Sequence, residues 1–270
     1  MRVAIVPARN EEGHLSAVLN SLISVVDSVV VVDDASTDGT GEIALANGCV
    51  VLRNERHGGY GHALRRGLHW CRANGASIAV TMDADGQHRA EWIESGIDLL
   101  SEGADVVLAN RFSALDDVPW TKVLSNNLAW YCVKKIVGRR PVCRDVSCGF
   151  RIYNHRSLTK VIEVAGAKTP GYAFGQSSCA ELHRCGLKLA VLDVPPIYPK
   201  PVEGTAITEV NDIVAWLLTC PAVHLEARRW EEALESGRDV IFEFEDWRNE
   251  ARVLRVIGRR NGKFLMFSEA

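Results

Sequence analysis

An apolar, strand-like run ends in two carboxylates, a glycine and an amide in the stretch Ile78-Ala79-Val80-Thr81-Met82-Asp83-Ala84-Asp85-Gly86-Gln87-His88. Alternate residues of an extended chain point to the same side, so Asp83 and Asp85 are expected to project together. Two adjacent carboxylates are unfavourable unless a cation or ligand neutralises them. Oxygen ligands, with the Gln87 amide among them, suit Mg²⁺ or Mn²⁺. The alternative is a strand followed by an ordinary polar turn, where Asp, Gly and Gln are common.

The strand belongs to a longer alternation of strands and helices. Further strands are predicted at residues 3–6, 28–32, 49–52 and 105–109, each followed by a helix or a helix-entering loop. This order indicates an α/β fold with an open, mostly parallel sheet flanked by helices, which binds its ligand beyond the carboxyl ends of the strands. Polar side chains stand at those ends: Arg9 and Glu11, Asp33 and Asp34, Asp83 and Asp85, and Arg111.

A glycine-rich loop around Gly59 leads into a helix. Glycine lets a backbone approach a ligand closely, and a helix N-terminus favours anions, so the loop is a candidate ligand contact. The alternative is that these glycines serve only the geometry of a turn and contact no ligand.

The second half of the chain is less regular. Helices are predicted at residues 120–137, 177–185, 212–218 and 226–234, and strands at 187–194 and after the loop that starts at 145. Alternating segments at 240–244, 252–257 and 263–267 predict a small β-meander. We therefore expect a main domain over residues 1–235 and a β extension over 236–270. The extension carries no recognisable chemistry but could supply a homodimer contact.

Composition narrows the class of protein. The 270 residues are 47% hydrophobic with a net charge of −3, which gives no overall basic footprint for nucleic acid. Eight cysteines without a CxxC pair fit reduced thiols, and Cys143 and Cys148 lack the second pair that a zinc site needs. No signal peptide or membrane-spanning run is evident. We expect a cytoplasmic protein, in which residues 213–223 form a core helix or touch a membrane surface peripherally.

Four motifs together resemble a known family. They are Val6-Pro7-Ala8-Arg9-Asn10-Glu11-Glu12, Val32-Asp33-Asp34-Ala35-Ser36-Thr37-Asp38-Gly39-Thr40, Met82-Asp83-Ala84-Asp85-Gly86-Gln87-His88 and Ser147-Cys148-Gly149-Phe150-Arg151. Their order resembles family 2 glycosyltransferases with the GT-A fold, nearest the dolichyl- or polyprenyl-phosphate mannose and glucose synthases. The resemblance covers about residues 1–205.

The resemblance implies transfer of a hexose from a UDP- or GDP-sugar with inversion at the anomeric carbon. The positions that match nucleotide contacts are Pro7, Arg9, Glu11 and Asp34, with Asp33 beside it, and the glycine-rich loop adds Gly59 as a candidate contact. Asp83 matches a residue near the ribose and donor sugar, Asp85 the metal ligand, and Gln87 a second candidate ligand. The implied catalytic set is Asp83, Asp85, Arg111, Arg144 and Arg151, although each arginine could instead be an ion-paired or surface residue.

The acceptor is the open question. Family members that glycosylate hydroxyl groups carry an acidic pair where this chain has Ser177 and Ser178. A hydroxyl nucleophile needs a base, whereas a lipid phosphate is already anionic. The missing acids favour a polyprenyl-phosphate acceptor at a membrane surface, unless Glu181 or Asp145 substitutes. Lys200 stands where that branch carries an arginine, which is a departure. A soluble hydroxyl acceptor and a non-catalytic nucleotide-sugar-binding protein remain alternatives.

Overall fold

The computed structural model describes residues 1–115, 118, 120–164, 174–198, 239–245, 251–260 and 263–267. Its strands are β1 (Arg2–Ala8), β2 (Ser28–Asp33), β3 (Val50–Val51), β4 (Ile78–Thr81), β5 (Val106–Asn110), β6 (Arg151–Asn154), β7 (Leu189–Asp193), β8 (Asp239–Glu245), β9 (Ala251–Arg260) and β10 (Lys263–Phe267). Its helices are α1 (Glu12–Leu22), α2 (Thr40–Ala46), α3 (Tyr60–Ala73), α4 (Trp92–Ser101), α5 (Trp120–Val137), α6 (His155–Val164) and α7 (Phe174–Arg184).

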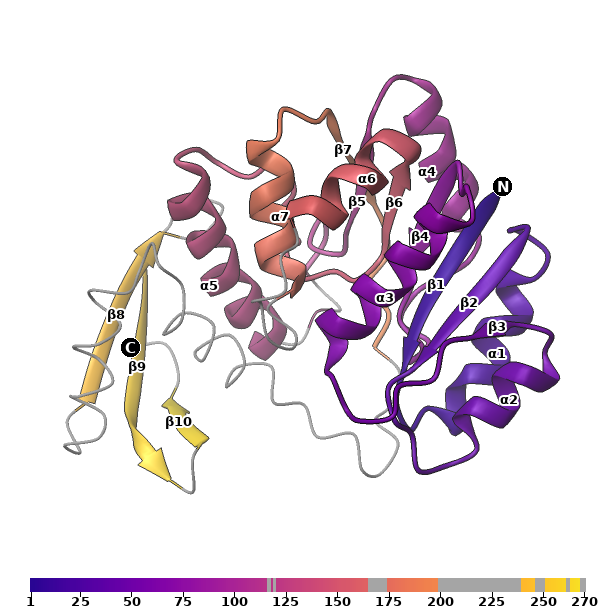
Figure 1. Ribbon diagram of the computed structural model, residues 1–270. Helices are drawn as coiled ribbons and strands as arrows, with labels where there is room; N and C mark the ends of the chain where they lie inside the picture. Colours follow the sequence, from indigo (N-terminus) through magenta and orange to yellow (C-terminus); the bar gives the residue numbers. More distant parts are fainter. Residues whose placement is uncertain are drawn as a thin grey trace.

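Seven strands form one mixed, mostly parallel sheet in the order β3-β2-β1-β4-β6-β5-β7 (Figure 1). Only β6 runs antiparallel, to β4 on one side and β5 on the other. One apolar layer joins the sheet to α3, α5, α6 and α7, and a second joins the opposite face to α1, α2 and α4. The predicted α/β class is therefore confirmed.

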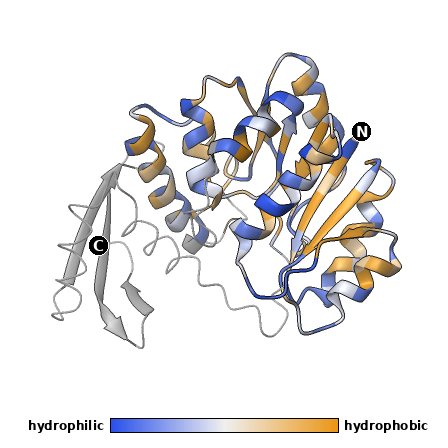
Figure 2. Ribbon diagram, in the orientation of Figure 1, coloured by the Kyte–Doolittle hydropathy of each residue, from blue (hydrophilic) through white to orange (hydrophobic). Residues whose placement is uncertain are grey.

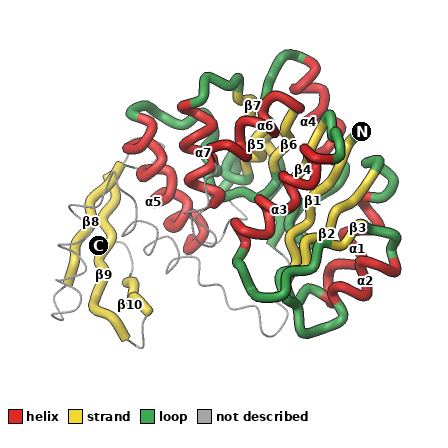
Figure 3. The backbone as a smooth tube through the Cα atoms, viewed as in Figure 1, coloured by secondary structure: helices red, strands yellow, loops and turns green. Residues whose placement is uncertain are grey.

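The central strands are apolar because helices cover both of their faces. Figure 2 shows β1 and β2 as hydrophobic over most of their length, and Val3, Ile5, Val30 and Val32 are 0% exposed. Parallel sheets that are covered on both sides have this composition. The loops that follow these strands converge at one end of the sheet (Figure 3), so the polar groups at the strand ends meet there.

Pro7 was expected to end the first strand at residue 6, but β1 continues to Ala8. Ile5 accepts the main-chain N–H of Met82, so the next residue that faces the β4 side is Pro7. The β1–β4 pairing has ended at Thr81 by then, while the β2 side continues to Asp33. The N–H that proline lacks is therefore not needed there.

Helix α6 was not predicted. It begins directly after β6, where the Asn154 side chain accepts the main-chain N–H of Ser157 at 2.8 Å. Asparagine at this position is a standard N-cap, and this signal could have located the helix. The predicted helices at 212–218 and 226–234, the segment 213–223 and Lys200 lie outside the described residues.

Strands β8, β9 and β10 form a separate antiparallel sheet, which confirms the predicted meander. The boundary between residues 235 and 236 stays a prediction. The seven cysteines in the described part of the chain are free thiols. None of the helices in the described ranges is long and apolar enough to cross a bilayer.

Candidate active site

The carboxylate of Asp34, at the end of β2, is surrounded by four donors. Its Oδ1 accepts Asn54 Nδ2 at 2.6 Å and the Gly58 N–H at 2.9 Å. Its Oδ2 accepts the Gly59 N–H at 2.8 Å and faces His57 Nδ1 at 2.7 Å. Burial opposes ionisation, but the hydrogen bonds outweigh it and lower the pKa of Asp34. The anion that the glycine-rich loop binds in this structure is thus Asp34 itself.

Gly59 is required for this arrangement. Its φ of 85° lies in the left-handed region, and it immediately precedes α3. Its N–H points at Asp34, so the loop is folded around the end of β2. The structure therefore brings Gly59 and Asp34 together, a contact that the sequence did not predict.

Asp33 points the opposite way from Asp34, into the protein. It is 0% exposed, accepts the Ser36 N–H at 2.9 Å and lies 3.5 Å from Arg53 Nε. A Cβ on Gly41 would stand 2.9 Å from its Oδ2. Asp33 therefore stabilises the loop after β2 through its contacts with Ser36 and Arg53.

The residues at the end of β1 form the opposite wall of the same loop region. Pro7 is buried, Arg9 is exposed, and Glu11 is half-buried with its N–H donated to Thr40 Oγ1 at 2.8 Å. Burial, followed by the charges of Asp85 and Asp83, raises the pKa of Glu11 to about 7. Glu11 therefore lies within electrostatic reach of the carboxylates that follow β4.

Asp83 and Asp85 are held differently. Asp83 Oδ1 accepts the Tyr60 hydroxyl at 2.7 Å, while Asp85 accepts the N–H and the Nε2 of Gln87 at 3.0 and 2.7 Å. The polar turn that was the alternative to a ligand site is thus present, and the two carboxylates are still close enough to interact. Burial, and then the charge of Asp83, raises the pKa of Asp85.

This carboxylate cluster fits a divalent cation. The charges of Asp83 and Asp85 disfavour ionisation of Glu11, and that of Asp83 disfavours ionisation of Asp85, and a cation would reverse that effect. Within the described ranges no group of three or more His, Cys, Asp or Glu side chains is placed to hold a metal ion, so the protein ligands alone do not define a metal site. Mg²⁺ ordinarily takes one or two carboxylates and completes its shell with phosphates and water.

His88 was missed as a site residue. Its Nδ1 accepts the Asp83 N–H at 3.1 Å, and its Nε2 lies 3.5 Å from Cys148 Sγ. Burial, and next the charge of Arg111, lowers the pKa of His88 to about 4, so the ring is neutral and can accept. Its position five residues after Asp83, at the end of the motif, is the signal that sequence reasoning left unused.

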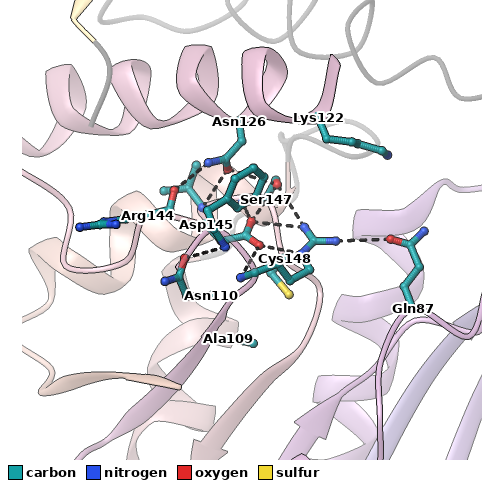
Figure 4. Close-up of polar contacts among 12 residues, drawn as sticks. Gln87, Ala109, Asn110, Lys122, Asn126, Arg144, Asp145, Ser147 and Cys148 are labelled. Atoms are coloured by element: carbon teal, nitrogen blue, oxygen red, sulfur yellow. Dashed lines mark hydrogen bonds and ion pairs between the residues drawn. The ribbon is translucent and has the colours of Figure 1, made fainter. Parts of the chain in front are cut away.

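Arg111 and Asp145 form a buried bidentate ion pair (Figure 4). Arg111 Nε and Nη2 lie 2.7 and 3.3 Å from the two oxygens of Asp145, and Nη1 donates to Gln87 Oε1 at 3.4 Å. Burial opposes ionisation of Asp145, but the charge of Arg111 outweighs it and lowers the pKa. The pair links the loop after β5 to the Gln87 turn, as the ion-paired alternative for Arg111 anticipated.

Arg151 and Arg144 lie in contrasting places. Arg151 is 4% exposed and donates to the carbonyl oxygens of Gly175, Val146 and Cys148 at 2.6, 3.3 and 3.3 Å and to Ser178 Oγ at 2.7 Å. Arg144 is exposed, and Figure 4 shows its side chain directed away from the Asp145 pair. Arg151 therefore ties β6 to the first turn of α7, while Arg144 is accessible to a ligand.

The chain is similar in sequence and fold to several known proteins. The chain is 30% identical over 183 residues to polyprenol monophosphomannose synthase of Mycolicibacterium smegmatis, covering 64% of this chain and 68% of the relative. It is 29% identical over 256 residues to undecaprenyl-phosphate mannosyltransferase of Micrococcus luteus, covering 86% of this chain and 97% of the relative. A crystal structure of glucosyl-3-phosphoglycerate synthase from Mycobacterium tuberculosis has the same fold, with a TM-score of 0.59, 20% identity and coverage of 81% and 79% of the two chains. Residues 3–162, more than half of the chain, match the model of glycosyl transferase family 2, and the chain belongs to this family of sugar-transferring enzymes.

Proposed function

We propose that this glycosyltransferase moves a hexose from a UDP- or GDP-sugar to a polyprenyl phosphate, with inversion and with help from Mg²⁺ or Mn²⁺. An oxygen of the lipid phosphate forms the new bond to the anomeric carbon while the bond to the nucleoside diphosphate breaks. The observation that carries the acceptor choice is the way Asp145 and Ser178 are engaged.

A hydroxyl acceptor would need a general base, and the two acids that could replace the missing pair are engaged elsewhere. Asp145 is bound to Arg111 with a lowered pKa, which makes it a weak base. Glu181 pairs with Arg184 at 3.4 Å on α7. Ser178 donates to the main chain of α7 and accepts from Arg151. An acceptor that is already ionised fits these residues better.

The names of two relatives support the same acceptor. Both the Mycolicibacterium and the Micrococcus proteins are named for mannose transfer to a polyprenyl phosphate. The structurally similar synthase from Mycobacterium tuberculosis is described with Mn²⁺, UDP-glucose and phosphoglyceric acid, and also with Mg²⁺ and UDP. It supports a nucleotide-sugar donor and a divalent cation, and it makes a small phosphorylated acceptor the second candidate.

We assign the donor side to the residues at the ends of β1, β2 and β4. Asp85, with Gln87 and Asp83 beside it, would hold the cation, and Glu11 would lose its proton when the cation arrives. The cation would neutralise charge on the departing diphosphate. Asp83 would face the ribose and sugar, and the exposed Arg9 and Arg144 would approach phosphates.

Calorimetric titration with a panel of UDP- and GDP-sugars, with and without Mn²⁺, tests the donor assignment. One sugar nucleotide should bind tightly only with the metal, and Asp85→Ala should abolish this binding. A panel without any binder would contradict the proposal.

The acceptor is tested separately with a radiolabelled form of the donor found by calorimetry. Undecaprenyl phosphate should give a product that extracts into organic solvent, whereas 3-phosphoglycerate should leave the label in water. Transfer to phosphoglycerate alone would replace the lipid acceptor by the second candidate and leave the donor site intact.

A further inference from the structure

The Asp83 carboxylate is fixed from outside its own loop. Tyr60, the first residue of α3, donates its hydroxyl to Asp83 Oδ1 at 2.7 Å. A phenol is protonated at neutral pH, so the Tyr60 hydroxyl acts as the donor to the carboxylate. The Asp83 side chain is 27% exposed, so part of the carboxylate still faces the solvent where a donor would bind.

Gly149 packs directly against the contact between Tyr60 and Asp83. A Cβ at this position would stand 2.5 Å from both carboxylate oxygens of Asp83 and 2.5 Å from the Tyr60 hydroxyl. Thr81 donates its hydroxyl to the Gly149 carbonyl oxygen at 2.6 Å, which anchors the backbone at that point. Only glycine therefore allows the carboxylate and the hydroxyl to meet over this segment.

Among the described contacts, Asp85 accepts no hydrogen bond from a residue outside its own turn. Its two oxygens accept hydrogen bonds from Gln87, two residues further along the same turn. In the described part of the chain, Asp85 is reached from outside the turn only through Gln87, which accepts a hydrogen bond from Arg111, whereas Asp83 accepts one directly from α3. The two carboxylates of the motif thus differ in how firmly they are oriented.

We propose that Tyr60 is a positioning residue for the sugar-nucleotide donor, acting through Asp83 and with Gly149 leaving room for the contact. Tyr60 orients the Asp83 carboxylate before the donor arrives. A preorganised acceptor binds a sugar or ribose hydroxyl more tightly, because the cost of fixing its rotamer has already been met. This proposal rests on the proposed donor site.

Tyr60→Phe keeps the ring and removes only the hydroxyl, so it isolates the contact. Donor affinity, measured by calorimetry with Mn²⁺, should fall by roughly tenfold, the effect of one hydrogen bond to a charged group. In an Asp83→Ala background the same substitution should cause no further loss, because the double-mutant cycle removes the residue through which Tyr60 acts. Gly149→Ala should also weaken binding, because its methyl displaces Asp83 or Tyr60.

Tyr131→Phe is the matched control, since it removes a tyrosine hydroxyl from α5 that is not among the described contacts of Asp83, and should leave donor affinity unchanged. Thermal unfolding of every variant reports whether the fold is intact. Wild-type affinity in Tyr60→Phe would overturn the proposal, and so would an equal loss with and without Asp83. A wild-type protein that binds no donor would overturn the proposed function, and this assignment with it.

Discussion

Asp34 shows how one carboxylate can organise a binding loop. An ionised carboxyl group offers about four lone-pair positions, and Asn54, His57, Gly58 and Gly59 occupy them. Its role as a nucleotide contact remains a prediction, and the structure adds a second role in folding the loop. Sequence could predict that Asp34 lies at the strand end, but not that the glycine-rich loop turns back onto it.

Asp34→Asn should therefore destabilise the protein. An amide NH₂ in place of one oxygen would face the Gly58 or Gly59 N–H, leaving buried donors opposed and unsatisfied. We expect a loss of about 2–3 kcal/mol in the free energy of unfolding. Urea denaturation measures it. Asp27→Asn, which affects one exposed contact to the Arg2 N–H, is the control and should cost well under half as much.

Glu11 gives a prediction with a pH signature. Its pKa is raised from 4.5 to about 7 in the folded protein, so the folded state binds the proton more tightly than the unfolded state. The free energy of unfolding should fall as pH rises from about 4.5 through 7, and the penalty is complete above that pH. Glu11→Gln should stabilise the metal-free protein at pH 8 by about 1–2 kcal/mol, after allowance for solvent screening, and much less at pH 5.

Urea denaturation at both pH values measures this difference. Glu55→Gln, at an exposed position of the neighbouring loop, should give the same small change at pH 5 and pH 8. An equal gain for Glu11→Gln at the two pH values would show that the raised pKa of Glu11, set by burial and then by the charges of Asp85 and Asp83, is not its cause.

At the scale of elements, the hydrophobic periodicity and the polar residues at the strand ends predicted most strands of the sheet. They did not predict the direction of β6 or the end of β1, because contacts between distant segments determine both. The expected helix at residues 120–137 coincides with α5, and the valine-rich second strand coincides with β2 apart from its last residue. The antiparallel insertion of β6 between β4 and β5 has no local signature, since direction is set by the path of the loop before it. From sequence, Pro7 likewise predicts the end of the strand. Only the structure shows that the pairing with β4 has already ended at Thr81, so that the missing N–H is not needed.

The environments of the three candidate arginines could not be predicted from sequence for the same reason. A sequence shows that Arg111, Arg144 and Arg151 are cationic, but only the fold shows that the first two differ in exposure and that the third is surrounded by carbonyl oxygens. Arg151→Lys should lower the free energy of unfolding by about 2–4 kcal/mol, because an ammonium cannot replace the fork that binds several acceptors. Arg144→Ala, at an exposed position, should leave stability within about 0.5 kcal/mol.

Steady-state kinetics test whether Arg144 has a role in binding the acceptor. If Arg144 approaches the acceptor phosphate, Arg144→Ala should raise the acceptor KM several-fold while its unfolding curve stays that of the wild type. Steady-state kinetics with undecaprenyl phosphate measure it. An unchanged acceptor KM would remove Arg144 from the proposed site.

At the scale of the whole molecule, a polyprenyl-phosphate acceptor requires the protein to reach an anionic bilayer. Residues 118–144 contain no Asp or Glu and six cations, which are Lys122, Lys134, Lys135, Arg139, Arg140 and Arg144. The surface also presents Val142, which is 52% exposed, and Lys135 lies over the Tyr131 ring at 5.2 Å. If the acceptor is a polyprenyl phosphate, we expect this basic segment, in a chain with a net charge of −3, to be the part that meets anionic lipid.

The protein should therefore sediment with vesicles that contain phosphatidylglycerol, and this binding should weaken as salt is raised because surface charges are screened. Lys135→Glu with Arg140→Glu should reduce partitioning about tenfold or more, since each basic residue near the surface contributes about 1 kcal/mol. Arg72→Glu with Lys188→Glu, at exposed positions outside the segment, changes the net charge equally and should have a much smaller effect. Equal losses in the two double variants would mean that net charge, and not this face, drives the contact. Binding to neutral phosphatidylcholine vesicles at the same level would mean that the basic segment is not what the membrane recognises.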